Sequence, residues 1–127
     1  MAYVNIFAGW IGMLAGVVSG AIIGLCFHRE DWLGGYTSYP RRLIRLGHIS
    51  FFGLGLLNIL FGLTSAVIHL HGPGQRIASP ALIVGAIAMP ACCFLSAWKK
   101  PLRHLFPIPV IAVAKGICAL LIEWGKP

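Results

Sequence analysis

Four long apolar stretches, separated by short segments rich in Pro, Gly and basic residues, occupy most of this chain. They cover residues 3–27, 41–71, 80–98 and 109–124. The hydrocarbon core of a bilayer is about 30 Å thick, so a helix of about 20 apolar residues crosses it. The pattern therefore predicts an all-α integral membrane protein, in which residues 1–127 form a single four-helix transmembrane bundle.

The composition favours lipid over water as the surroundings. Of the 127 residues, 58% are hydrophobic and only 10% are charged, and a soluble domain of this size needs more polar surface to cover itself. The net charge is +7, but the basic residues lie at the ends of the apolar stretches, where they suit anionic headgroups. We therefore expect the lipid bilayer as a partner and no binding of nucleic acid.

The distribution of Lys and Arg predicts the orientation. The segments after the first and third apolar stretches lie on one side of the predicted membrane and carry most of the cations: Arg29, Arg41, Arg42, Arg45, Lys99, Lys100 and Arg103. The other side carries Arg76 and Lys126. Because the cation-rich side of a membrane protein is usually cytoplasmic, we expect both termini outside, in a bacterial inner membrane.

Small residues indicate where helices pack closely. In the first stretch a glycine recurs every fourth residue, at Gly12, Gly16, Gly20 and Gly24. This spacing places the glycines on one stripe of a helix, and small residues let helices approach closely in lipid. In the second stretch, Gly55 and Gly62 are predicted packing positions, and Asn58 is expected to hydrogen-bond across helices.

At about 100° per residue, the second stretch divides into two faces. The small and polar face is predicted to point inward and carries Arg41, Arg45, His48, Phe52, Gly55, Asn58, Gly62, Ser65, Ala66 and His69. The large apolar face is predicted to meet lipid and carries Leu46, Ile49, Leu57, Leu60, Phe61, Val67 and Ile68. The third helix is predicted to begin at Ser79-Pro80, with Ser as N-cap and Pro in the first turn.

A b-type haem is one candidate cofactor. Haem iron takes two imidazoles from neighbouring helices, and arginines can pair with its propionates. His48 shares its predicted face with Arg41 and Arg45, and His28 or His104 is the candidate second ligand. His48 and His69 are about six turns apart on their helix, wider than the ligand spacing of two-haem membrane cytochromes. The competing interpretation of His48 is an interfacial histidine that is hydrogen-bonded to a neighbour.

A metal site is a weaker candidate. His69 and His71 lie on the same predicted side as Glu123. Residues two positions apart on a helix point to different faces, so His-x-His alone is a weak ligand pattern. The competing interpretation is a helix end at the membrane surface.

Transport is a third alternative, in which a homo-oligomer conducts or carries a solute. Asn58, Ser65 and Lys115 are the side chains that would line its path. Proton-coupled transport needs a carboxylate inside the membrane, and the sequence places none there. Lys115 is the one charge inside the fourth stretch, and we expect it in the cytoplasmic half, reaching for the headgroups.

Enzymatic function is not expected, because the sequence offers no Ser/His/Asp set, no paired carboxylates within the spans and no phosphate-binding loop. The stretch RRLIRLGHISFFGLGLLN resembles small proteins found with bacterial respiratory complexes. This likeness indicates no named family, and no property is carried over from it; a respiratory complex is the larger assembly that we expect. We expect a small non-catalytic subunit or accessory protein of a larger membrane complex, with other subunits or copies of itself as partners.

Overall fold

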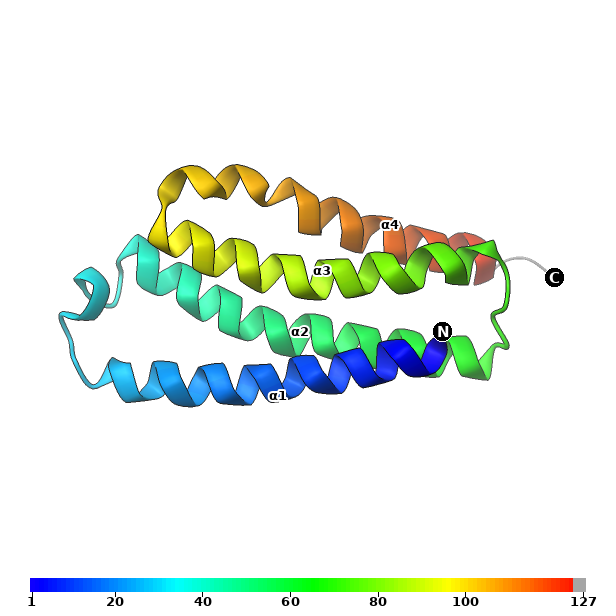
Figure 1. The fold of residues 1–127 in the computed structure, drawn as a ribbon, viewed down its shortest axis with the longest axis horizontal. Helices are drawn as coiled ribbons and strands as arrows, with labels where there is room; N and C mark the ends of the chain where they lie inside the picture. Colours follow the sequence, from blue (N-terminus) through cyan, green and yellow to red (C-terminus); the bar gives the residue numbers. More distant parts are fainter. Residues whose placement is uncertain (125–127) are drawn as a thin grey trace.

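The structure is a computed structural model that describes residues 1–124, and all its regular elements in that range are helical (Figure 1). The elements are α1 (Ala2–Phe27), η1 (Trp32–Gly34), α2 (Tyr39–Val67), α3 (Pro73–Trp98), η2 (Lys100–Leu105) and α4 (Pro107–Trp124). Four of these segments are long and apolar enough to cross a membrane, with η2 and α4 counted as one. The predicted all-helical class and the number of long apolar helices are thus confirmed.

The four helices pack in chain order as an open bundle. α1 packs on α2, α2 on α3, and α3 on α4, while α1 and α3 touch only lightly across α2. Figure 1 shows the same order from α1 at one edge to α4 at the other. α2 and α3 therefore have neighbours on two sides, whereas α1 and α4 keep most of their surface exposed.

The end of α2 differs from the prediction, because the helix stops at Val67 rather than at His71. His69 has a left-handed φ of 51°. Its N–H donates to Ala66 O, and the Leu70 N–H donates to Ser65 O at 2.9 Å. These two bonds form a Schellman motif, in which the residue after the cap turns left-handed and the next apolar side chain packs back. Leu70 fills that apolar position and is only 5% exposed.

The start of α3 also differs, because the helix begins at Pro73, well before the predicted Ser79-Pro80. Pro73 itself occupies the first turn, where a missing N–H costs nothing. Ser79 lies inside the helix, and its hydroxyl donates to the Asn5 side chain instead of capping a helix end. The helix continues through both Pro80 and Pro90.

Residues of both predicted faces of α2 are buried. Phe61, predicted to face lipid, is 2% exposed and belongs to a buried cluster with Leu70, Ala78 and Leu82. Ala66, predicted to point inward, is exposed. The division into two faces fails here because α2 is covered by α1 on one side and by α3 on the other.

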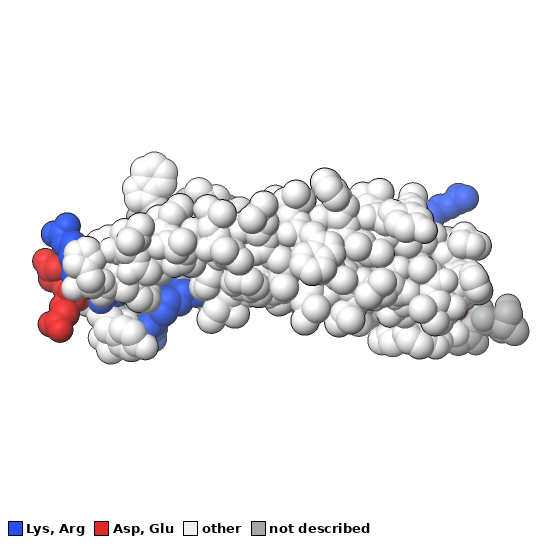
Figure 2. Space-filling model, turned by 90° about the horizontal axis from the view of Figure 1, so that it is seen from below, with Lys and Arg blue, Asp and Glu red and all other residues white. Residues whose placement is uncertain are grey.

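The two ends of the molecule differ in charge. The N-terminus, the α2–α3 turn and the end of α4 lie together at one end (Figure 1). The α1–α2 loop and η2 lie at the opposite end. On the face that Figure 2 shows, most of the Lys, Arg, Asp and Glu side chains gather at the loop end, and the long middle section carries none. Arg76 is at the N-terminal end, and Lys126 lies outside the described residues.

Candidate functional site

The most complete constellation of polar side chains is a buried node that joins α1, α2 and α3. The Asn5 amide donates to Asn58 Oδ1 at 2.8 Å and to the Ser79 carbonyl at 3.2 Å, and its Oδ1 accepts from the Ser79 hydroxyl. Asn58 donates to Leu54 O within its own helix and to Leu82 O of α3 at 3.2 Å. Asn5 and Asn58 are both 0% exposed. Every polar atom of the two amide side chains therefore has a partner, which is what burial requires.

A second polar contact lies between the same helices nearer the N-terminal end. Gln75 of α3 donates to the Ser65 hydroxyl of α2 at 2.8 Å. Both residues are buried. Together with the Asn5–Asn58–Ser79 node, this bond fixes the register of α2 against α3. The chemistry of amides and hydroxyls here is structural, since none of these groups titrates near neutral pH.

The predicted packing glycines lie mainly between α1 and α2. A Cβ on Gly12 would contact the Gly55 backbone at 3.4 Å, and one on Gly16 would lie 2.7 Å from the Phe52 ring. A Cβ on Gly62 would lie 2.5 Å from Ile6. A side chain at Gly16 or Gly62 would therefore collide with the facing helix, whereas one at Gly12 would be in van der Waals contact with it. Gly24 differs from the others, because no described atom lies within 4 Å of its Cβ position.

His48 is held against α1. Its Nδ1 is 3.1 Å from the Ser19 hydroxyl. A Cβ added to Gly20 would be 2.6 Å from the His48 Cε1 and 3.2 Å from Nε2, so the ring lies directly on the α1 backbone. Its edge meets the Phe52 ring at a centroid distance of 5.3 Å. Both ring nitrogens are therefore directed at α1.

Arg41 and Arg45 bind backbone carbonyls of the α1–α2 loop. Arg41 is 3% exposed and donates to Glu30 O at 3.0 Å and Arg29 O at 2.9 Å. Its guanidinium also lies over the rings of Phe27 and Trp32, with centroid distances of 4.9 and 5.6 Å.

Arg45 makes a similar pair of contacts with one residue. It donates to the Tyr36 carbonyl at 3.2 Å and lies 4.2 Å from the centroid of the Tyr36 ring. The two arginines thus fasten the loop to the start of α2.

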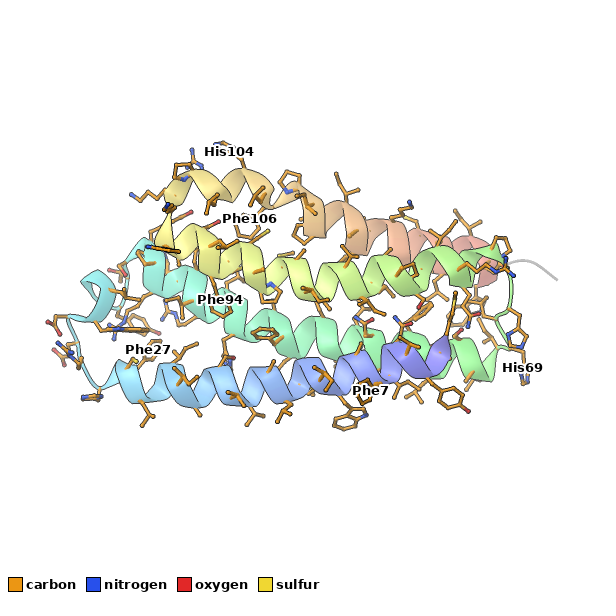
Figure 3. The ribbon with its side chains drawn as sticks, in the orientation of Figure 1. Phe7, Phe27, His69, Phe94, His104 and Phe106 are labelled. Atoms are coloured by element: carbon orange, nitrogen blue, oxygen red, sulfur yellow. The ribbon has the colours of Figure 1, made fainter. Side chains whose placement is uncertain are left out.

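The candidate haem ligands are not brought together. His28 is exposed and bonded to the Leu25 carbonyl of its own helix. His104 is exposed on η2, and Figure 3 shows it on the outer side of that element, away from α1 and α2. His48 has its Nδ1 at the Ser19 hydroxyl, and Arg41 and Arg45 bind loop carbonyls, so the structure does not bring the five predicted residues together around one space.

His69 and His71 are exposed at the α2–α3 turn, and Figure 3 shows His69 at that end of the molecule. Glu123 accepts a hydrogen bond from the Gly74 N–H at 3.1 Å, so its carboxylate caps the start of α3. Within residues 1–124, no group of three or more His, Cys, Asp or Glu side chains is placed to hold a metal ion. The predicted pair and Glu123 therefore form no such group here.

Lys115 is exposed on α4. It lies in the half of the molecule that contains the N-terminus, whereas the prediction placed it in the half that contains the cation-rich loops. The next residue, Gly116, packs against Ala78 and Leu82, which belong to the first three turns of α3. Lys115 therefore lies nearer to Arg76 and the N-terminal end of the molecule than to the cation-rich loop end. The predicted position of Lys115 is too close to the loop end because η2 precedes α4 and lengthens this segment.

An apolar groove of about 540 Å³ lies between α1 and α3, with α2 beneath it. Small residues make up part of its lining: Ala8, Gly12, Ala15, Ala86 and Ala91. Phe7, Phe51 and Phe94 also line it. Two further grooves, of about 310 and 440 Å³, lie between α3 and α4, and Lys115 and Ile77 line both of them.

Sequence reasoning missed Asn5, Gln75 and the role of Ser79. The signal that identifies Asn5 is an amide in an otherwise apolar span, the same signal that singled out Asn58. A comparison of the chain with protein-family models, with curated proteins and with solved structures gives no match.

Proposed function

We propose that the chain spans a bacterial inner membrane with α1 to α4 and acts as a small non-catalytic subunit or accessory protein of a larger membrane complex, in a respiratory setting. The cation-rich loop end would face the cytoplasm, and both termini would lie outside. Most of the apolar side chains on α1 and α4 are exposed, which suits contact with lipid or with other membrane helices.

The observation that carries the proposal is the groove between α1 and α3. Helices associate in lipid where small residues permit close backbone approach, because no hydrophobic force acts between helices there. The α1–α3 groove presents such residues on a surface that no further helix of the chain covers, within residues 1–124. A transmembrane helix of a partner subunit would fit this surface, in contact with its small and aromatic residues.

Native co-purification tests the proposal. The chain carries an affinity tag and is extracted from its own membranes in a mild detergent, and the sample is analysed by native electrophoresis and mass spectrometry. We expect a defined partner subunit in stoichiometric amount. Ala91→Trp fills the groove at an exposed position and should release that partner. Ala114→Trp, on the exposed surface of α4, is the matched control and should retain it.

The same sample separates the two alternatives. A Soret band that disappears in His48→Ala would favour a haem-binding electron-transfer subunit and would overturn the non-catalytic reading. A homo-oligomer that conducts ions after reconstitution would favour a channel or transporter. A chain that migrates as a monomer without any partner would count against all assembly roles.

A further inference from the structure

We infer that the larger of the two grooves between α3 and α4, of about 440 Å³, binds the phosphate of an anionic glycerophospholipid through Arg76 and Lys115. The inference rests on the membrane insertion proposed above but not on the identity of any partner subunit. It concerns a different face of the molecule from the α1–α3 groove.

The first observation is that two cations line one groove. Arg76 in the first turns of α3 and Lys115 of α4 both line the cavity of about 440 Å³. The rest of its lining is apolar: Ile77, Pro80, Ala81, Val84 and Ala112. Both cationic residues are exposed, so the charges face whatever surrounds the molecule.

The second observation concerns counter-charge. Among residues 1–124, neither the Arg76 nor the Lys115 side chain forms a hydrogen bond or an ion pair. Glu123 lines the adjoining groove beside Lys115, but its carboxylate is engaged at the Gly74 N–H. The other acids, Glu30 and Asp31, lie in the α1–α2 loop at the far end of the molecule. Among residues 1–124, no acidic side chain lines the groove of about 440 Å³ itself, and Glu123 lines only the adjoining groove.

The chemistry of the ligand follows from these two facts. A cation held away from water within a membrane carries a desolvation cost, and a lipid phosphate at the level of Arg76 and Lys115 removes part of that cost. A free phosphate would meet the two cations but would leave the apolar walls of the groove without an apolar partner. A phospholipid supplies both parts, because its phosphate meets the cations while its acyl chains cover Ile77 and Val84.

Native mass spectrometry of the purified chain in a non-ionic detergent tests this directly. The probes are phosphatidylglycerol, phosphatidylcholine and inorganic phosphate, each titrated separately. We expect one phosphatidylglycerol to bind in preference to phosphatidylcholine, and no retention of inorganic phosphate. Lys115→Gln and Arg76→Gln should each weaken phosphatidylglycerol binding about fivefold, the effect of one cation near a lipid surface. Lys115→Arg should bind as the wild type does.

The matched control is Arg103→Gln, which removes an exposed cation from η2 at the other end of the molecule. It should leave the affinity unchanged. Equal binding of the two lipids, an unchanged affinity in both groove variants, or an equal loss in the control would each overturn the inference. Binding of inorganic phosphate without lipid preference would also overturn it, and would assign the groove to a free anion. Loss of a partner subunit does not enter this assay, so it can fail independently of the proposed function.

Discussion

The hydrogen bond between Asn5 and Asn58 should be measurable as a coupling free energy between α1 and α2. Asn5→Ala removes three contacts to other helices: one with the Asn58 amide and two with Ser79. Asn58→Ala removes two, to Asn5 and to Leu82 O. Interhelical hydrogen bonds in membrane proteins contribute about 0.6 kcal/mol each on average. We expect losses of about 2 kcal/mol for Asn5→Ala and about 1 kcal/mol for Asn58→Ala.

The double variant isolates the shared bond. Its destabilisation should fall short of the sum of the single effects by about 0.6 kcal/mol, and by no more than about 1.7 kcal/mol. The assay is reversible unfolding in mixed micelles with increasing dodecyl sulfate, followed by circular dichroism, with free energies compared at one detergent composition.

Ser50→Ala provides the matched control, because within residues 1–124 the Ser50 hydroxyl bonds to Gly47 O of its own helix and to no other helix. Combined with Asn5→Ala, it should give additive losses. A coupling of zero between the two asparagines would refute the assignment of the node. So would a coupling to Ser50 as large as that to Asn58.

Three further predictions concern packing, the turn after α2 and the loop clamp. Gly9→Ala should cost about 1–3 kcal/mol, because its Cβ would lie 2.5 Å from Gly55 O; Gly24→Ala, with open space in the described structure, should be neutral or stabilising in the same titration. His69→Gly should raise the unfolding free energy by up to about 1 kcal/mol by relieving the left-handed φ of 51°, and a destabilised variant would contradict the Schellman assignment. Arg41→Lys should speed proteolysis of the α1–α2 loop, because lysine cannot hold both carbonyls in the same fork, whereas the exposed Arg42→Lys should leave that rate unchanged.

The sequence predicts the long helices well because apolar length is a strong local signal. Helix ends are harder, and α3 shows why. Gly72-Pro73 and Ser79-Pro80 are both acceptable starts by local rules, and the choice between them depends on a tertiary partner. Ser79 has that partner in Asn5, which lies on another helix and far away in the sequence.

The candidate site was harder to predict than the fold. The stripe of glycines is visible in the sequence, and three of its members meet α2, but nothing local indicates that Gly24 lies beyond the contact. His48 and Arg41 have residue types that suit a cofactor. Only the arrangement of α1 and its loop shows that both are engaged with the chain itself.

The neighbour-to-neighbour order of the helices has a consequence for how the chain is made. Each helix meets its principal partner immediately before or after it in the chain, so every helix after α1 can pack against one that has already been made. The α1–α2 hairpin can form with its Asn5–Asn58 bond before α3 is complete. Ser79 then adds its hydroxyl when α3 arrives. Assembly can thus follow synthesis stepwise, with one helix added to the bundle at a time.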